Sequence, residues 1–215
     1  MGIRKSHRIA SVAFGAALVA GSTLYSAPAH AAVVTTPVTL ACQADWPFDG
    51  IVFTTSQTIT SNTPTSVQRR ATFTGTGTSA PYTVPTEVSG APITELRDFT
   101  LSLQFSGPAS VTGASLSGGS NIGSGVPTVT TTTNSVTLKV PGPLTAGTTV
   151  TMPQIRINAT AANTTGTVQM KVKGTSYTDP GLRVTAVVPF DPDPIVAPSG
   201  CYPSPSPVLA SIAVT

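Results

Sequence analysis

Apolar and polar residues alternate with a period of two along most of the chain from residue 34 onward. The clearest case is 99–106, where Phe99, Leu101, Leu103 and Phe105 share one face and polar residues occupy the other. This period is typical of a β-strand with one buried face, and no helical period continues beyond one turn. The pattern predicts further strands at 34–42, 51–60, 67–76, 136–140, 150–157, 168–172, 182–188 and 208–214.

Residues that form turns separate these strands. Examples are Gly107-Pro108, Pro141-Gly142-Pro143 and Asp179-Pro180-Gly181. Short strands at such spacing are typical of an antiparallel sandwich. A β-helix would require a repeat of fixed period, and the sequence contains none. We therefore expect an all-β fold, an antiparallel immunoglobulin-like β-sandwich of about nine strands.

Prolines are concentrated in the segment 189–207, which precedes the last predicted strand. Proline has no N–H to donate to a sheet ladder, so we expect this segment to be extended and without regular pairing. No second domain is evident, and we assign residues 32–215 to a single β-sandwich domain.

The first 31 residues have the organisation of a cleaved signal peptide. Arg4, Lys5 and Arg8 precede an apolar run over 9–25, and Ala29 and Ala31 give the small-x-small pattern of a signal peptidase site. A membrane anchor is the alternative, but the run is short and no basic cluster follows it. We expect cleavage after Ala31 and a secreted or cell-surface protein, with no membrane attachment afterwards.

Charge and histidine content narrow the function of the exported part. The leader contains three of the eleven basic residues, so eight remain against eight acidic residues. Arg69-Arg70 is the only adjacent basic pair among them, and without a larger basic cluster nucleic acid is not an expected partner. We interpret this pair as lying in an edge strand. Both histidines, His7 and His30, lie in the leader, which leaves no imidazole for a triad or a zinc site.

Cys42 and Cys201 are the only cysteines. An even pair in an exported chain predicts a disulfide. Because Cys201 lies in the proline-rich segment, we interpret the bond as a clamp on the C-terminal strand rather than as part of the core.

Two groups of acidic residues are candidate sites. Asp45 and Asp49 flank Trp46, and an aromatic ring between two carboxylates could bind or cleave a sugar. The alternative interpretation is that Trp46 closes one end of the sandwich. Asp191 and Asp193 are most simply solvated turn charges, because calcium would require further oxygen ligands. We expect no catalytic residue, no metal site and no cofactor.

Two stretches of the sequence resemble known proteins. The stretch 144–151, Leu-Thr-Ala-Gly-Thr-Thr-Val-Thr, resembles the strand entry of bacterial extracellular immunoglobulin-like domains. The spacing of Cys42 from Cys201, with Tyr202-Pro203 and the run 208–210 after it, resembles secreted actinobacterial β-sandwich domains of unknown function. This resemblance implies an extracytoplasmic sandwich and provides no catalytic residues.

Together these features favour an exported, non-enzymatic protein of the cell envelope or medium with a structural or binding role. Its uncharged polar faces suggest cell-wall polysaccharide or an envelope protein as the partner. The alternative is a carbohydrate-binding or glycan-active protein that uses Asp45, Asp49 and Trp46.

Overall fold

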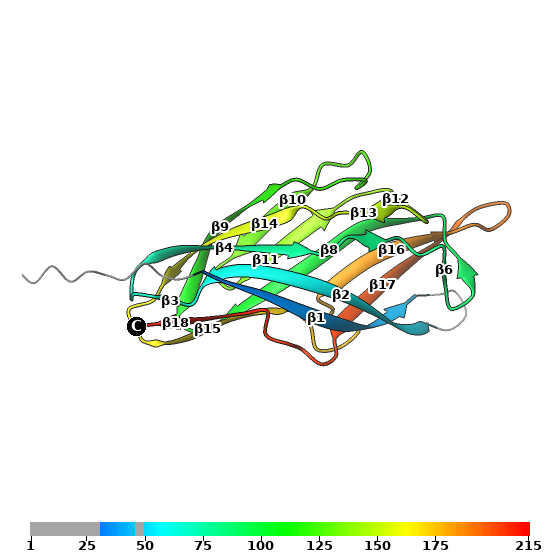
Figure 1. Ribbon diagram of the computed structural model, residues 1–215. Coiled ribbons are helices and arrows are strands. Elements are labelled where there is room, and N and C mark those ends of the chain that lie inside the picture. The colour runs from blue at the N-terminus through cyan, green and yellow to red at the C-terminus, as the bar shows by residue number, and fades with distance from the viewer. Residues whose placement is uncertain (1–30, 46–49) are drawn as a thin grey trace, which may run out of the picture.

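The computed structural model describes residues 31–45 and 50–215, which form an all-β protein with no helix among them (Figure 1). Twelve strands have five or more residues: β1 (Ala31–Ala44), β2 (Ile51–Pro64), β4 (Thr72–Ser79), β8 (Glu95–Ser106), β9 (Ala109–Ser117), β10 (Thr128–Thr132), β11 (Ser135–Val140), β14 (Gln154–Ala161), β15 (Gly166–Val172), β16 (Leu182–Val188), β17 (Ile195–Pro203) and β18 (Ala210–Val214). Six further strands have two residues each: β3 (Ser66–Val67), β5 (Tyr82–Thr83), β6 (Glu87–Val88), β7 (Ala91–Pro92), β12 (Leu144–Thr145) and β13 (Thr149–Val150). The expected all-β, antiparallel, sandwich-like fold is confirmed.

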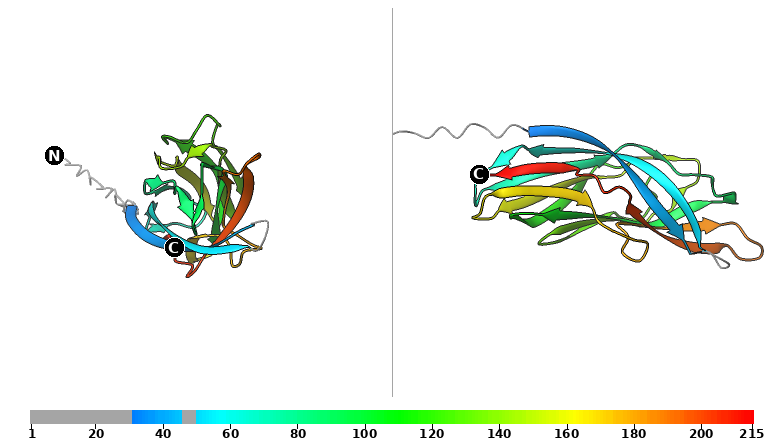
Figure 2. Two further views of the ribbon diagram at one scale, coloured as in Figure 1. Left: turned by 90° about the vertical axis from the view of Figure 1, so that its right-hand side faces the viewer. Right: turned by 90° about the horizontal axis from the view of Figure 1, so that it is seen from below.

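One large sheet contains fourteen of these strands. Its main path runs β3-β18-β15-β8-β16-β17-β1-β2-β4-β14-β9, and β11 and β12 pair with the other edge of β8. All pairings are antiparallel except the short one between β18 and β3. Seen along the long axis, the sheet curls so that its inner faces look toward one another (Figure 2).

Strand β10 pairs with β11, and the turn of this hairpin lies beside β9, the strand at the end of the main path. The N–H of Val111 on β9 donates to the carbonyl of Thr133 in the hairpin turn, at 2.9 Å. The N–H of Phe105 on β8 donates to the neighbouring carbonyl of Asn134, at 2.8 Å. The sheet is therefore a flattened roll that closes on itself at this point, which protects the edge of β9.

Alternating side chains of the strands form the interior of the roll. On β8, Leu96 and Leu103 are buried, and Phe99, Leu101 and Phe105 are half-buried on the same inner face. A second, smaller cluster lies at the end of the molecule where β15 and β18 pair. It consists of Val67, Ala161, Val168, Ile212 and Val214.

The expectation that the proline-rich segment 189–207 lacks regular pairing is wrong. Strand β17 lies inside it and pairs with β16 on one side and β1 on the other. The carbonyl of Pro198 accepts the N–H of Asp45, so the backbone of Pro198 faces the β1 side, where β1 ends. The N–H that proline lacks is therefore not needed by the ladder with β16.

Two other expectations about strands are corrected. Arg69 and Arg70 lie in the turn between β3 and β4, where Arg70 has φ of 62°, so they are not in an edge strand. The run 150–157 is split into β13 and β14 around Pro153. Strands β9 and β10 were not expected, because Gly, Ser and Thr predominate in them and a bulge in β9 interrupts the alternation of its apolar residues.

Candidate functional site: an apolar cavity inside the roll

The roll encloses a cavity of about 490 Å³ between its two layers. One wall comes from β8, β15, β16 and β17, and the opposite wall from β1, β2, β4 and β14. Inner-facing side chains that a packed core would cover are only half-buried here, among them Phe99, Leu101 and Val184. The other end of the molecule differs, because the void beside the second hydrophobic cluster measures only about 20 Å³. The roll is thus hollow toward one end and packed toward the other.

Small residues create this space. Ala186 on β16, Ala197 and Ser199 on β17 and Gly77 on β4 all line the cavity. Gly77 is buried, yet a Cβ placed on it would meet no atom within 4 Å. Its neighbours across the ladder, Ser61 and Ile155, are buried as well, so this position faces the interior. The cavity therefore lies where the inner face offers too little side-chain volume to fill the roll.

The cavity reaches the surface at the edge of β2. Five successive residues of that strand, 53–57, line it. Successive side chains of a strand point to opposite faces, so a cavity that touches all five must extend around the strand edge. On this side β2 pairs with β4 only over 59–62, with one further bond from Ala80 to Thr58. We call the gap beside 51–57 of β2 the portal.

The segment 82–93, which we call the strap, forms the other side of the portal. Its first part is fixed to the body, since β5 pairs with β13 and the Val84 N–H donates to the carbonyl of Thr148. Its second part is the β6–β7 hairpin, which forms a separate two-stranded sheet. The N–H of Ile93 donates to Thr86 and closes the base of this hairpin at 2.8 Å. The hairpin thus borders the portal without a sheet ladder to the roll.

Few polar groups line the cavity, and they gather at the portal. Gln57 closes the inner corner, donating from Nε2 to the Ala80 carbonyl at 2.8 Å. Burial raises the pKa of the Tyr82 phenol above its ordinary value. Ser79 has a buried hydroxyl without a hydrogen-bond partner among the described residues. Among the described residues, Glu87, which is exposed, is the only carboxylate in the lining, and no Lys or Arg of 31–45 or 50–215 lines it.

Leaving such a cavity empty would be unfavourable. Without a guest, the mostly apolar wall faces water that enters through the portal, and removing apolar surface from water is worth roughly 25 cal/mol per Å². The volume of the cavity also lies within the usual range of ligand pockets, about 300–1,000 Å³. An apolar guest that fills the space would remove this cost.

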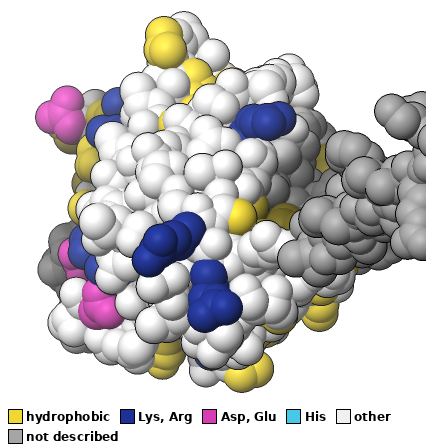
Figure 3. Space-filling view, turned by 90° about the vertical axis from the view of Figure 1, so that its left-hand side faces the viewer, with side chains coloured by type: hydrophobic (Ala, Val, Ile, Leu, Met, Phe, Trp, Pro, Cys, Tyr) yellow, Lys and Arg dark blue, Asp and Glu magenta, His cyan; other side chains and the backbone are white. Residues whose placement is uncertain are grey.

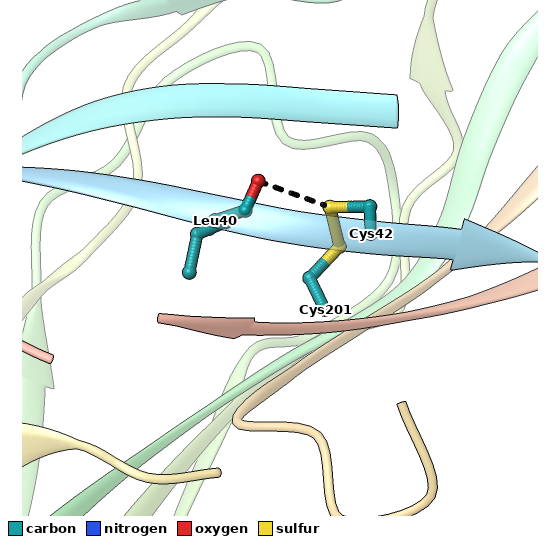
Figure 4. Close-up of a disulfide and its surroundings, with 3 residues drawn as sticks. All are labelled: Leu40, Cys42 and Cys201. Carbon is teal, nitrogen blue, oxygen red and sulfur yellow. Dashed lines mark hydrogen bonds between the residues drawn. A yellow bond between two sulfur atoms is a disulfide. The ribbon is translucent and has the colours of Figure 1, made fainter. Parts of the chain in front are cut away.

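The disulfide forms part of the cavity wall. Cys42 on β1 and Cys201 on β17 are direct cross-strand partners, joined with an S–S distance of 2.07 Å (Figure 4). The sulfur of Cys42 lies 3.9 Å from the carbonyl oxygen of Leu40, which is a contact only, because a sulfur in a disulfide has no proton to donate. The predicted disulfide is confirmed. Its expected place outside the core is wrong, since both cysteines are at most 1% exposed.

Acidic residues without an ion pair surround the open end. Three of the described acids are paired, Glu95 with Arg97, Asp98 with Lys139 at 3.3 Å, and Asp179 with Lys173 at 3.4 Å. The other four described acids are Asp45, Glu87, Asp191 and Asp193. Asp45 follows Ala44 of the cavity wall, and the loop with Asp191 and Asp193 follows Val188 of that wall. All four therefore lie at the end with the portal, on the right in Figure 1.

The opposite end has a different surface. In Figure 3 most of this face carries neither Lys or Arg nor Asp or Glu; several separate Lys and Arg side chains are visible, and acidic side chains are visible only toward the left edge of the view. Arg69 and Arg70 lie in the turn that leads from β3 to β4, next to the last strand. The charges of the roll are thus distributed unevenly, with unpaired acids concentrated at the open end.

The structure describes one of the three residues of the carbohydrate site expected at Asp45, Trp46 and Asp49. Asp45 is exposed, and its backbone N–H donates to the carbonyl of Pro198 at 2.8 Å. Trp46 and Asp49 lie outside the described residues, so that site stays a prediction. The leader 1–31 likewise lies outside them, apart from Ala31, the first residue of β1. Within 31–45 and 50–215, no three metal-ligating side chains come together.

Sequence reasoning missed the cavity itself. The alternation of apolar and polar residues in a strand is the same whether its inner side chains pack against an opposite layer or line an empty space. The sequence contains one weak indication of the cavity, namely that several inner positions of β16 and β17 are small. Ala186 and Ala197 are cross-strand partners, and Ser199 lies two residues further along β17.

No family model matches the chain, and no curated protein matches its sequence. A solved structure resembles the fold, described as "Putative membrane anchored protein from Corynebacterium diphtheriae", with a TM-score of 0.56 and 16% identity. The match covers 86% of this chain and 38% of that chain, so the chain spans well under half the length of that protein. At this identity the likeness shows the fold alone. Within the described residues, no helix is long and apolar enough to span a membrane.

Proposed function

We propose that this protein is an exported, non-enzymatic binding protein of the cell envelope that holds an apolar ligand inside the roll. The cavity of about 490 Å³ with its apolar lining is the observation that carries the proposal. A ligand that enters it gains the burial of its own apolar surface, at roughly 25 cal/mol per Å², and fills a space that is unfavourable to leave empty.

The location rests on three observations. The leader 1–31 has the pattern of an export signal, and the disulfide is typical of an oxidising compartment. The structural neighbour from C. diphtheriae is described as membrane anchored, which supports a place at the cell envelope.

The composition of the lining supports a non-enzymatic role. Among the described residues, Glu87 has no second carboxylate beside it in the wall, and acid–base hydrolysis of a glycoside uses two. No histidine follows residue 30 in the sequence to act as a general base. The same lining is mostly aliphatic, which suits an alkyl or ring system better than a sugar. We therefore favour an apolar ligand over the polysaccharide partner suggested by the outer faces.

A matched pair of glycine variants tests this function. Gly77→Leu places about four carbons into the cavity, whereas Gly113→Leu adds the same group on β9. A Cβ placed on Gly113 would likewise meet no atom within 4 Å, but this residue lies opposite the exposed Asn158 and does not line the cavity. Replacing glycine restricts the backbone of the unfolded chain equally in both variants. A difference in dye binding or stability between them therefore comes from the side chain that enters the cavity.

The assay is fluorescence of N-phenyl-1-naphthylamine, an uncharged dye that brightens in apolar surroundings. We expect saturable binding to the wild type and to Gly113→Leu, at least about tenfold weaker binding to Gly77→Leu, and a raised melting temperature of Gly77→Leu because it fills empty volume. Equal dye binding by the two variants, or no binding by the wild type, contradicts the proposal.

A further inference from the structure

The shape of the cavity restricts what can fill it. Its lining on β8 extends from Leu96 to Leu103, a length of roughly 23 Å at about 3.3 Å per residue. A volume of about 490 Å³ spread over that length is a long, narrow space, which suits an extended alkyl chain.

The length of the lining also restricts the length of that chain. An extended alkyl chain advances about 1.25 Å per carbon, so a chain of roughly sixteen carbons, about 19 Å long, fits within the length lined by β8. The closed end is formed by the buried side chains of Leu103, Leu138 and Met170. A chain of this length would reach from these residues to the portal.

The portal determines the polar end of the ligand. Glu87 stands in the strap at the cavity lining, and Asp45, Asp191 and Asp193 lie on the loops beside it, all without an ion pair among the described residues. In the part of the chain that the structure describes, no Lys or Arg lines the cavity to receive a carboxylate or a phosphate. An anionic headgroup at the portal would meet only negative charge, at a cost of about 1 kcal/mol per close pair in water.

We infer, building on the proposed function, that the ligand is an amphiphile with an alkyl chain of about sixteen carbons and an uncharged or cationic headgroup. Its alkyl chain lies along β8 toward Leu103, and its headgroup lies at the portal beside Glu87. Hydroxyl groups of a neutral headgroup would donate to the Glu87 carboxylate. Fatty acids and anionic phospholipids are disfavoured by the charge.

Displacement of N-phenyl-1-naphthylamine tests this inference with ligands that differ in one property at a time. Monopalmitoylglycerol, palmitate and palmitoylcholine share one sixteen-carbon chain and differ in the charge of the headgroup. At submicellar concentration and low salt, we expect monopalmitoylglycerol and palmitoylcholine to displace the dye with one-to-one stoichiometry. Palmitate should bind at least about fivefold more weakly, with a difference that shrinks as salt is added.

Two charge variants show whether Glu87 is responsible. Glu87→Lys should reverse the preference and favour palmitate. Asp179→Lys changes the net charge equally at the far end of β16 and should leave the preference unchanged.

The outcomes separate the two proposals. If the dye binds but palmitate and monopalmitoylglycerol displace it equally, the inferred ligand class is wrong and the proposed function stands. If the wild type binds no dye, the proposed function fails as well.

Discussion

Replacing both cysteines with alanine tests how much the disulfide contributes to the stability of the roll. The bond joins residues 159 positions apart. In the chain-entropy model its loss raises the conformational entropy of the unfolded chain and lowers the free energy of unfolding by about 5 kcal/mol. For a protein of this size each kcal/mol corresponds to about 2–4 °C, so the melting temperature of Cys42→Ala/Cys201→Ala should fall by about 10–20 °C. Alanine is the appropriate replacement, because a serine hydroxyl buried at these positions without a partner would add about 1–3 kcal/mol of its own.

Thermal and urea unfolding followed by circular dichroism provide the measurement. Wild type treated with a reductant should melt close to the double-alanine variant, since both lack the same crosslink. The pair Cys42→Ser/Cys201→Ser should melt lower than both. A fall of less than about 4 °C in the double-alanine variant would show that the bond does not hold β1 to β17 in the way described.

Three further predictions follow from single contacts. Ser61→Ala should cost about 1–2 kcal/mol in urea unfolding, because its buried hydroxyl donates to the Leu209 carbonyl at 2.5 Å, whereas Ser79→Ala should cost nothing, because its hydroxyl has no partner among the described residues; equal effects would contradict this. Gly181→Ala should prevent stable folding, since its Cβ would overlap the carbonyl oxygen of Lys173; a normal melting curve refutes it. Because burial raises the folded-state pKa of Tyr82, its contribution to stability is present below about pH 10 and is lost as pH rises through the folded pKa, so Tyr82→Phe should flatten the alkaline stability profile, and an unchanged profile argues against burial.

The fold was predictable where side-chain alternation is strong. On β8 the residues 99–106 alternate without interruption, and the structure places Leu101 and Leu103 on the inner face as expected. Strand β17 was not predictable, because its prolines argue against a paired strand. Pro198 can lie in the sheet only because β1 ends beside it, which the sequence does not show. The disulfide was predictable in its pairing but not in its position, for the same reason.

The candidate site could be predicted much less well. Alternation shows which residues face inward, but the distance between the layers decides whether they meet. The acids at the open end, such as Glu87 and Asp191, are scattered in the sequence, and only the curl of the sheet brings their loops to one end. The portal arises from a pairing that stops at Ile59 of β2, and no residue pattern marks that point.

Methyl NMR of the protein during titration with monopalmitoylglycerol tests the central claim most directly. If an alkyl chain enters the roll, the chemical shifts of methyl groups in the cavity wall, such as those of Leu101 and Val184, should change and saturate at one equivalent. The methyl groups of Val33 and Val126, which are 67% and 77% exposed and lie outside the cavity, should not change. Changes confined to the exposed valines, or none at Leu101 and Val184, would contradict an internal binding site.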